Sequence, residues 1–178
     1  GTAGIGNDTI SATGAGNVIN ASDGANSVTG GAGADTITTG SGNDTIVGTG
    51  GADSINGGAG ANVITTGAAG TAVVTGTGND LITGGAGTDT FTGGGGPDTL
   101  VGGGGIDTFV FASGSSPASG LLAGISQIND WSTAGADLLD ITVTAANLQT
   151  GTAADFATAR TAANVAFAGA PTSNVAAY

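Results

Sequence analysis

The stretch GGAGADTIT at residues 30–38 returns as GGAGTDTFT at residues 84–92, six periods of nine residues later. Asp holds the sixth place in both copies and recurs in the same phase along much of the chain. Where that phase lacks Asp, it carries Asn or Thr. These twelve residues, which we call the Asp series, are Asp8, Asn17, Asn26, Asp35, Asp44, Asp53, Asn62, Thr71, Asp80, Asp89, Asp98 and Asp107. Twelve nine-residue repeats therefore run from Ala3 to Val110 without an insertion.

A large apolar residue stands two places after every member of the Asp series. With 39% hydrophobic residues in the chain, twelve such matches in twelve would arise by chance with a probability of about 10⁻⁵, so the period reflects structure. Gly stands two places before most members and also four places before most of them. Each repeat thus reads G-G-x-G-x-D-x-U-x, where U is the apolar residue. The U residues are Ile10, Ile19, Val28, Ile37, Ile46, Ile55, Ile64, Val73, Ile82, Phe91, Leu100 and Phe109.

The two halves of the repeat predict a strand and a turn. The x-U-x part is rich in β-branched and aromatic residues, which favours a three-residue strand with U pointing inward. The Gly-rich part predicts a turn, because Gly adopts positive φ and lets backbone carbonyls converge. Converging carbonyls and a carboxylate form an all-oxygen site of the kind that Ca²⁺ prefers.

This repeat resembles the hemolysin-type calcium-binding repeat of RTX proteins. The resemblance covers about three-fifths of the chain and implies an all-β fold, a parallel β-roll in which two nonapeptides make one coil. Successive turns then alternate between two edges, and ions lie between turns that are 18 residues apart. The first edge would carry Asp8, Asn26, Asp44, Asn62, Asp80 and Asp98. The second edge would carry Asn17, Asp35, Asp53, Thr71, Asp89 and Asp107.

The resemblance also implies which residues bind several Ca²⁺ ions. Three pairs of same-edge neighbours are both Asp, namely Asp35/Asp53, Asp80/Asp98 and Asp89/Asp107, and we expect the best sites there. Sites that include Asn17, Asn26, Asn62 or Thr71 lose a carboxylate and should be weaker or empty. The candidate carboxylate ligands are Asp8, Asp35, Asp44, Asp53, Asp80, Asp89, Asp98 and Asp107. The candidate turn glycines are Gly31, Gly33, Gly40, Gly42, Gly58, Gly76, Gly78, Gly85, Gly87, Gly94, Gly96, Gly103 and Gly105.

One apolar residue in nine is a small core for a chain of this length, because ordering each residue costs about 1–2 kcal/mol. We therefore expect residues 1–111 to be disordered without Ca²⁺ and to fold cooperatively with it. The alternative is a structural roll or Gly-rich linker that binds no metal. This alternative does not explain why Asp recurs at the same place of the repeat.

Residues 112–178 are expected to form a small β/α cap after the roll. The bulky Phe109 and Phe111 at the end of the repeats are suited to close the roll. Residues 125–142, ISQINDWSTAGADLLDIT, are similar to the segment that follows the repeats in RTX proteins such as serralysin-like proteases. The matching residues are Asp130, Trp131, Gly135, Asp137, Asp140 and Ile141.

The cap leaves two pairs of alternatives open. Asp130, Asp137 and Asp140 either hold a further Ca²⁺ or belong to a plain β-hairpin. Residues 152–168, TAADFATARTAANVAFA, predict a helix with Thr152 as its N-cap. This helix is either part of an uncleaved type I secretion signal, as RTX resemblance implies, or one more packing element.

Composition excludes several classes of function. The chain of 178 residues has one Lys or Arg, 13 Asp or Glu, no His and no Cys, and a formal net charge of −12. Disulfides, Cys/His zinc sites and His-based or Cys-based catalysis are therefore impossible. A single Arg cannot neutralise a nucleic-acid backbone, and no apolar run is long enough to insert in a membrane. We expect no enzymatic activity in this chain.

The leading interpretation is a secreted calcium-binding module of a bacterial surface protein. The absence of Lys, Cys and Met and the abundance of Ala, Thr and Gly resemble calcium-dependent S-layer proteins, which self-associate into a lattice. One alternative is the C-terminal folding and secretion domain of an exoenzyme such as a serralysin-like protease. Another is an RTX adhesin or ice-binding roll. Because the sequence opens inside a repeat, we expect it to be the C-terminal part of a longer protein.

Overall fold

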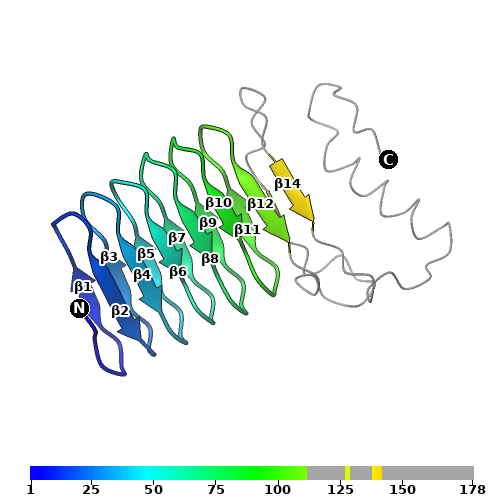
Figure 1. Ribbon diagram of the computed structural model, residues 1–178. Helices are drawn as coiled ribbons and strands as arrows, with labels where there is room; N and C mark the ends of the chain where they lie inside the picture. The colour runs from blue at the N-terminus through cyan, green and yellow to red at the C-terminus, as the bar shows by residue number, and fades with distance from the viewer. Residues whose placement is uncertain (112–126, 129–137, 142–178) are drawn as a thin grey trace, which may run out of the picture. The chain divides into compact units, whose positions relative to one another are not determined.

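The computed structural model describes residues 1–111, 127–128 and 138–141, which form strands and turns and no helix. Two parallel sheets face each other (Figure 1). The odd sheet consists of β1 (Thr9–Ser11), β3 (Ser27–Thr29), β5 (Thr45–Val47), β7 (Val63–Thr65), β9 (Leu81–Thr83), β11 (Thr99–Val101) and β13 (Gln127–Ile128). The even sheet consists of β2 (Val18–Ser22), β4 (Thr36–Thr39), β6 (Ser54–Asn56), β8 (Ala72–Val74), β10 (Thr90–Thr92), β12 (Thr108–Phe111) and β14 (Leu138–Ile141).

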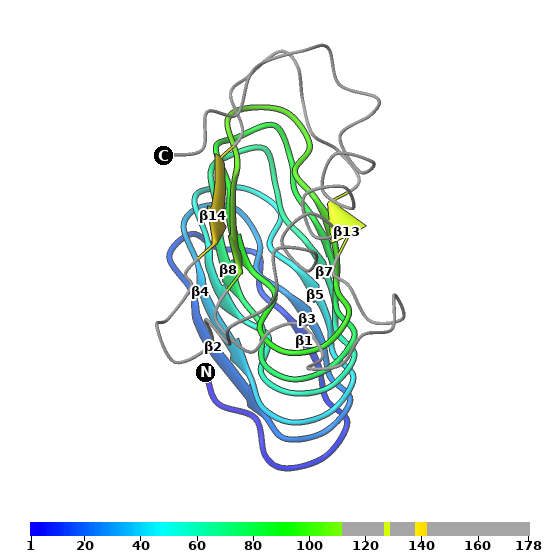
Figure 2. The same cartoon turned by 90° about the vertical axis from the view of Figure 1, so that its right-hand side faces the viewer.

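Consecutive strands alternate between the two sheets, so one coil contains two repeats. Within the repeats every neighbouring pair of strands is parallel and offset by 18 residues, as in Thr9↔Ser27 and Thr90↔Thr108, apart from a register shift at Ser22, which lies opposite Thr39. Figure 2 shows the coils stacked on one another, with β1, β3, β5 and β7 on one side and β2, β4 and β8 on the other. The expected fold, a parallel β-roll with two nonapeptides per coil, is confirmed.

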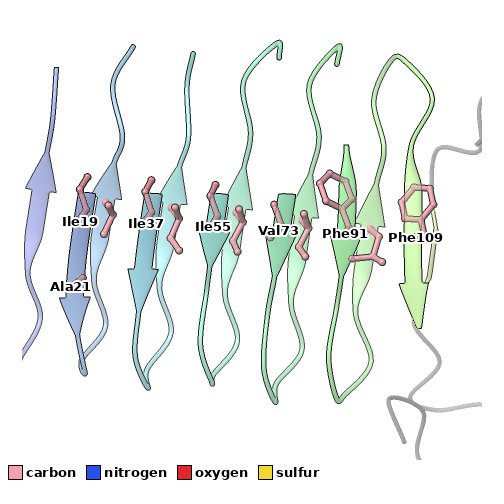
Figure 3. Close-up of a cluster of buried hydrophobic side chains, with 12 residues drawn as sticks. Ile19, Ala21, Ile37, Ile55, Val73, Phe91 and Phe109 are labelled. Carbon is pink, nitrogen blue, oxygen red and sulfur yellow. The ribbon is translucent and has the colours of Figure 1, made fainter. Parts of the chain in front are cut away.

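The core is a double row of U side chains between the sheets (Figure 3). Eleven of the twelve U residues are buried, and Ile10 in the first strand is partly buried. Phe91 and Phe109 meet edge to face with ring centroids 6.0 Å apart, which is a favourable aromatic geometry. The neighbours of U point outward, so each short strand follows the alternation that its sequence predicts.

The roll does not end at Phe109. β13 pairs in parallel with β11, and β14 pairs in parallel with β12. The expectation that Phe109 closes the roll is therefore wrong, because a further pair of strands follows it. Of the two alternatives left open for this segment, the plain β-hairpin does not hold for β13 and β14. A hairpin needs two antiparallel strands paired with each other, whereas β13 and β14 lie in different sheets.

The chain divides into two compact units, Gly1–Thr142 and Val143–Tyr178. The second unit, with the helix expected at residues 152–168, lies outside the described residues. The boundary expected between residues 111 and 112 stays a prediction. In the part of the chain that the structure describes, no helix is long and apolar enough to cross a membrane.

Candidate metal centres along two edges

The Asp series lines the inner side of the turns and is almost entirely withdrawn from solvent. From Asn26 onward every member is buried; Asp44 is 1% exposed, and Asp89 is fully buried. The only basic side chain, Arg160, lies outside the described residues. Burying an ionised carboxylate without a compensating partner is costly, so each carboxylate needs hydrogen bonds, a proton or a cation.

From Asp35 onward, Oδ1 of each Asp in the series accepts a hydrogen bond from a backbone N–H 18 residues earlier. The backbone N–H of Asp35 donates to Oδ1 of Asp53 at 2.9 Å, and that of Asp80 donates to Oδ1 of Asp98 at 3.0 Å. The same bond joins Asp89 N–H to Oδ1 of Asp107 at 2.8 Å. In each of the three Asp/Asp pairs expected from the sequence, the two residues are thus neighbours on the same edge and are joined by a hydrogen bond between coils.

The second oxygen of several carboxylates has no such partner. In five Asp residues, Oδ2 is buried and accepts no hydrogen bond within the protein. These residues are Asp8, Asp35, Asp44, Asp53 and Asp80. An unsatisfied buried acceptor costs about 1–3 kcal/mol, and more when it is charged. A column of such oxygens on each edge is therefore unstable without a positive charge.

The Gly-rich turns hold this second oxygen against the backbone. A Cβ atom on Gly48 would lie 2.5 Å from Oδ2 of Asp53, and one on Gly30 would lie 2.8 Å from Oδ2 of Asp35. In these two turns Gly is required five residues before Asp, whereas Thr39 and Thr75 hold the same place before Asp44 and Asp80. Gly at these places therefore lets Oδ2 lie close to the backbone of its own turn, where a side chain would displace it.

The turn glycines expected from the sequence bring the coils close together. Positive φ values occur at Gly31, Gly33, Gly42, Gly58, Gly78, Gly94, Gly96, Gly103 and Gly105. At Gly40, Gly76, Gly85 and Gly87 a Cβ atom would collide with the backbone of the neighbouring turn. All thirteen therefore lie where a larger residue would be strained, which agrees with their expected role in shaping the turns.

The donor set fits Ca²⁺. It consists of carboxylate and carbonyl oxygens, which hard cations prefer, and calcium accepts irregular geometry. Nowhere in the described residues do three acidic side chains gather at one point, so an ion would take at most two carboxylates together with backbone carbonyls. Same-edge carboxylates one strand spacing apart, about 4.8 Å, repel by about 3.5 kcal/mol at an effective dielectric of 20. A cation between them removes that repulsion.

The sequence matches a known repeat family. A family model of the RTX calcium-binding nonapeptide repeat matches in four copies, over residues 2–37, 11–46, 38–69 and 73–109. The chain belongs to the RTX calcium-binding repeat family. No curated protein and no solved structure matches it. The RTX roll described above is thus a calcium-binding roll by family, and its own geometry fits that ion.

The RTX resemblance also pointed to three acidic residues after the repeats. Asp130 and Asp137 lie outside the described residues. Asp140 lies in β14, opposite Val110 of β12 in the backbone register. Their proposed part in a further calcium site stays a prediction.

Sequence reasoning missed one acidic residue of the turns. Asp23, which is outside the Asp series, accepts hydrogen bonds from the N–H and Oγ of Ser41 at 2.8 and 2.9 Å. These bonds lower the pKa of its exposed carboxyl. The register of 18 residues between Asp23 and Ser41 was the signal that could have revealed this contact between coils.

Burial changes the acidity of the Asp series when no cation is present. Burial raises the pKa of Asp53, of Asp80 and most clearly of Asp89, to about 6. Backbone N–H groups partly oppose this rise, as do the side chains of Thr75 and Asn62 at Asp80. The folded roll therefore binds a proton at Asp89 more tightly than the unfolded chain does. Such a group stabilises the fold below its unfolded pKa of 3.8 and loses that effect as pH rises through about 6.

We expect the calcium-free chain to gain β structure on acidification from pH 7.5 to about 4.5, because protons then replace the missing cations. Far-ultraviolet circular dichroism in chelator measures this gain. Repeating the titration in about 1 M salt separates it from general repulsion between the surface charges, which salt screens. A β signal that stays constant over this pH range would contradict the prediction.

Proposed function

We propose that this chain is the calcium-dependent structural roll of a secreted bacterial surface protein. It folds when Ca²⁺ binds outside the cell and then takes part in a surface lattice. The observation that carries the calcium part is the column of buried Asp Oδ2 atoms without hydrogen-bond partners, in a chain with one basic side chain. Ca²⁺ supplies the missing positive charge, and the chain's own residues supply its oxygen ligands.

Secretion before folding follows from this calcium dependence. A chain that stays unfolded where free calcium is scarce can be exported by type I secretion machinery and fold only after export. The net charge of −12 keeps the calcium-free chain expanded, because like charges oppose compaction. Outside the cell, bound Ca²⁺ neutralises part of this charge and lets the chain fold.

The lattice part of the proposal is supported by composition and by the outer faces of the roll. Apolar side chains are exposed there, including Val18 at 67%, Val74 at 48% and Val63 at 43%. Short Thr, Ser and Val side chains make the remaining rows of the strands even, so copies of the roll can lie side by side. We propose no catalytic role, because the Asp residues are engaged in the turns and the chain has no His or Cys.

Electron microscopy tests the lattice directly. We expect two-dimensional arrays of the protein in millimolar Ca²⁺ and their dispersal when a chelator is added. Monodisperse protein across the whole millimolar range would contradict the lattice while leaving calcium binding intact. A zinc-binding motif encoded upstream of Gly1 would instead favour the exoenzyme alternative.

The ice-binding alternative is less well supported by the structure. A regular row of outward Thr side chains would be needed on one sheet. In the odd sheet the row that begins with Thr9 and Ser27 continues through Val63 and Leu81, which are exposed at 43% and 40%. Thermal hysteresis is therefore expected to be absent.

A further inference from the structure

Four members of the Asp series are not acidic, and each of them carries a hydrogen-bond donor. Asn26 and Asn62 lie on the first edge, between Asp residues. Their Oδ1 atoms take the same partners as a carboxylate would, accepting the N–H of Asp8 at 2.9 Å and of Asp44 at 3.0 Å. The bond between coils is therefore independent of whether the residue is Asp or Asn.

The second atom of each Asn side chain makes the difference. Nδ2 of Asn26 donates to the carbonyl oxygens of Ser22 at 3.2 Å and Gly24 at 3.0 Å. Nδ2 of Asn62 donates to those of Gly58 at 3.5 Å and Gly60 at 3.1 Å. In both turns the amide satisfies the carbonyls that lie four and two residues before it.

In the Asp turns an oxygen takes the place of this nitrogen. Nδ2 of Asn62 lies 3.5 Å from the Cβ position of Gly57, five residues earlier, just as Oδ2 of Asp53 lies 2.5 Å from that of Gly48. Asp44 is 1% exposed, and its Oδ2 has no hydrogen-bond partner. The Asp44 turn therefore buries a charged acceptor where the Asn turns carry a donor, and a cation would satisfy it. In the Asp89 turn the N–H of Gly85 donates to Oδ2 at 3.3 Å.

The other two exceptions follow the same pattern. Nδ2 of Asn17 donates to the carbonyl oxygen of Gly14 at 2.8 Å and to that of Gly30, in the next coil, at 3.1 Å. Oγ1 of Thr71 donates to the carbonyl oxygen of Ala69 at 3.3 Å. Each non-acidic member thus donates hydrogen to a carbonyl of its own turn.

We propose that the side-chain donors of Asn17, Asn26, Asn62 and Thr71 replace a calcium ion in their turns. These turns are complete without metal, and the Asp turns are the ones that take Ca²⁺. On the first edge, Asp and Asn alternate from Asp8 to Asp80, so only every second turn there requires an ion. This inference rests on the proposed calcium function and specifies which turns bind the ion.

The test exchanges donor and acceptor at one turn in the full chain. Asn62→Asp is expected to raise the number of bound Ca²⁺ ions by one and to move the folding midpoint to higher free calcium. The reciprocal variant Asp44→Asn is expected to lower the number by one. Isothermal titration calorimetry gives the stoichiometry, and circular dichroism during a Ca²⁺ titration gives the midpoint.

Asn43→Asp is the matched control. Asn43 is exposed, precedes Asp44, and uses its Oδ1 to accept the N–H of Ala61 at 2.9 Å, which a carboxylate also does. This variant adds the same charge at an exposed place of the turn, beside the buried Asp series but not in it, so its ion number should equal that of the original chain.

Three outcomes decide between the hypotheses. An unchanged ion number in both Asn62→Asp and Asp44→Asn, in a chain that itself binds calcium, overturns the inference. If Asn62→Asp does not fold, the loss of one ion in Asp44→Asn still supports it, and an unchanged number still overturns it. Failure of the original chain to bind any Ca²⁺ overturns the proposed function as well.

Discussion

Removal of calcium at neutral pH is expected to abolish most of the β structure of residues 1–111. Without cations, the buried Oδ2 atoms of Asp35, Asp44, Asp53 and Asp80 have no hydrogen-bond partner within the protein. Each ion present at 10–100 times its dissociation constant stabilises the fold by about 1.4–2.7 kcal/mol. The three Asp/Asp pairs alone then account for about 4–8 kcal/mol, comparable with the whole stability of a typical domain. Losing them should unfold the roll.

Circular dichroism during chelation measures this effect, and added Ca²⁺ should restore the signal. Mg²⁺ at the same concentration is the control, because it is smaller, requires octahedral geometry and retains its waters. It should restore little of the β signal. A signal that survives complete chelation would mean that the roll holds its buried carboxylates without metal.

The coil architecture could be predicted because the repeats are strictly periodic. With no insertion between Ala3 and Val110, each U residue has the same surroundings, so one repeat describes all twelve. The pairing of Asp35 with Asp53 follows from the same period. Two nonapeptides per coil place these residues on one edge, as the hydrogen bond between them shows.

The role of the Asn residues could not be predicted in the same way. From the sequence alone, Asn26 and Asn62 could be interpreted only as places where a carboxylate is missing. Their positive contribution depends on where the carbonyls of the turn point, and the positive φ values of the turn glycines set that direction. This is information about backbone conformation, which residue types indicate only indirectly.

The segment after the repeats was predicted less well for a related reason. Asp140 and Ile141 matched a family pattern, but the repeat period is lost between β12 and β14. Without a period, the sequence did not indicate whether two strands pair with each other or continue the two sheets. The structure shows the second arrangement for β13 and β14.

Gly94→Ala is expected to destabilise the calcium-bound roll strongly. Gly94 has φ of +74°, and an added Cβ would overlap the carbonyl oxygen of Gly76 and lie 2.6 Å from that of Thr75. Positive φ costs a non-Gly residue about 1–3 kcal/mol, and overpacking costs about 1–3 kcal/mol more. The melting temperature should therefore fall by about 10 °C or more.

Ser22 and Thr49 lie at the same place of their repeats as Gly94 and also have positive φ, so this place tolerates some residues other than Gly. Ala is the informative substitution at Gly94 because it lacks the hydroxyl group that both of these residues have. Ser22 Oγ donates to the carbonyl oxygen of Ala3 at 3.0 Å, and Thr49 Oγ1 donates to that of Gly31. These hydrogen bonds offset part of the strain, whereas Ala adds a Cβ with no donor. The substitution therefore isolates the cost of the close approach between coils.

Gly95→Ala is the matched control for this substitution. Its Cβ would meet nothing closer than Cγ2 of Thr77 at 3.8 Å, and its φ is not positive. Replacing this Gly restricts only the unfolded chain, so stability should stay unchanged or rise by up to about 1 kcal/mol. Thermal melts of both variants in saturating Ca²⁺ give the comparison. Equal losses of melting temperature in the two variants would mean that the close approach of neighbouring turns is not the reason for Gly at position 94.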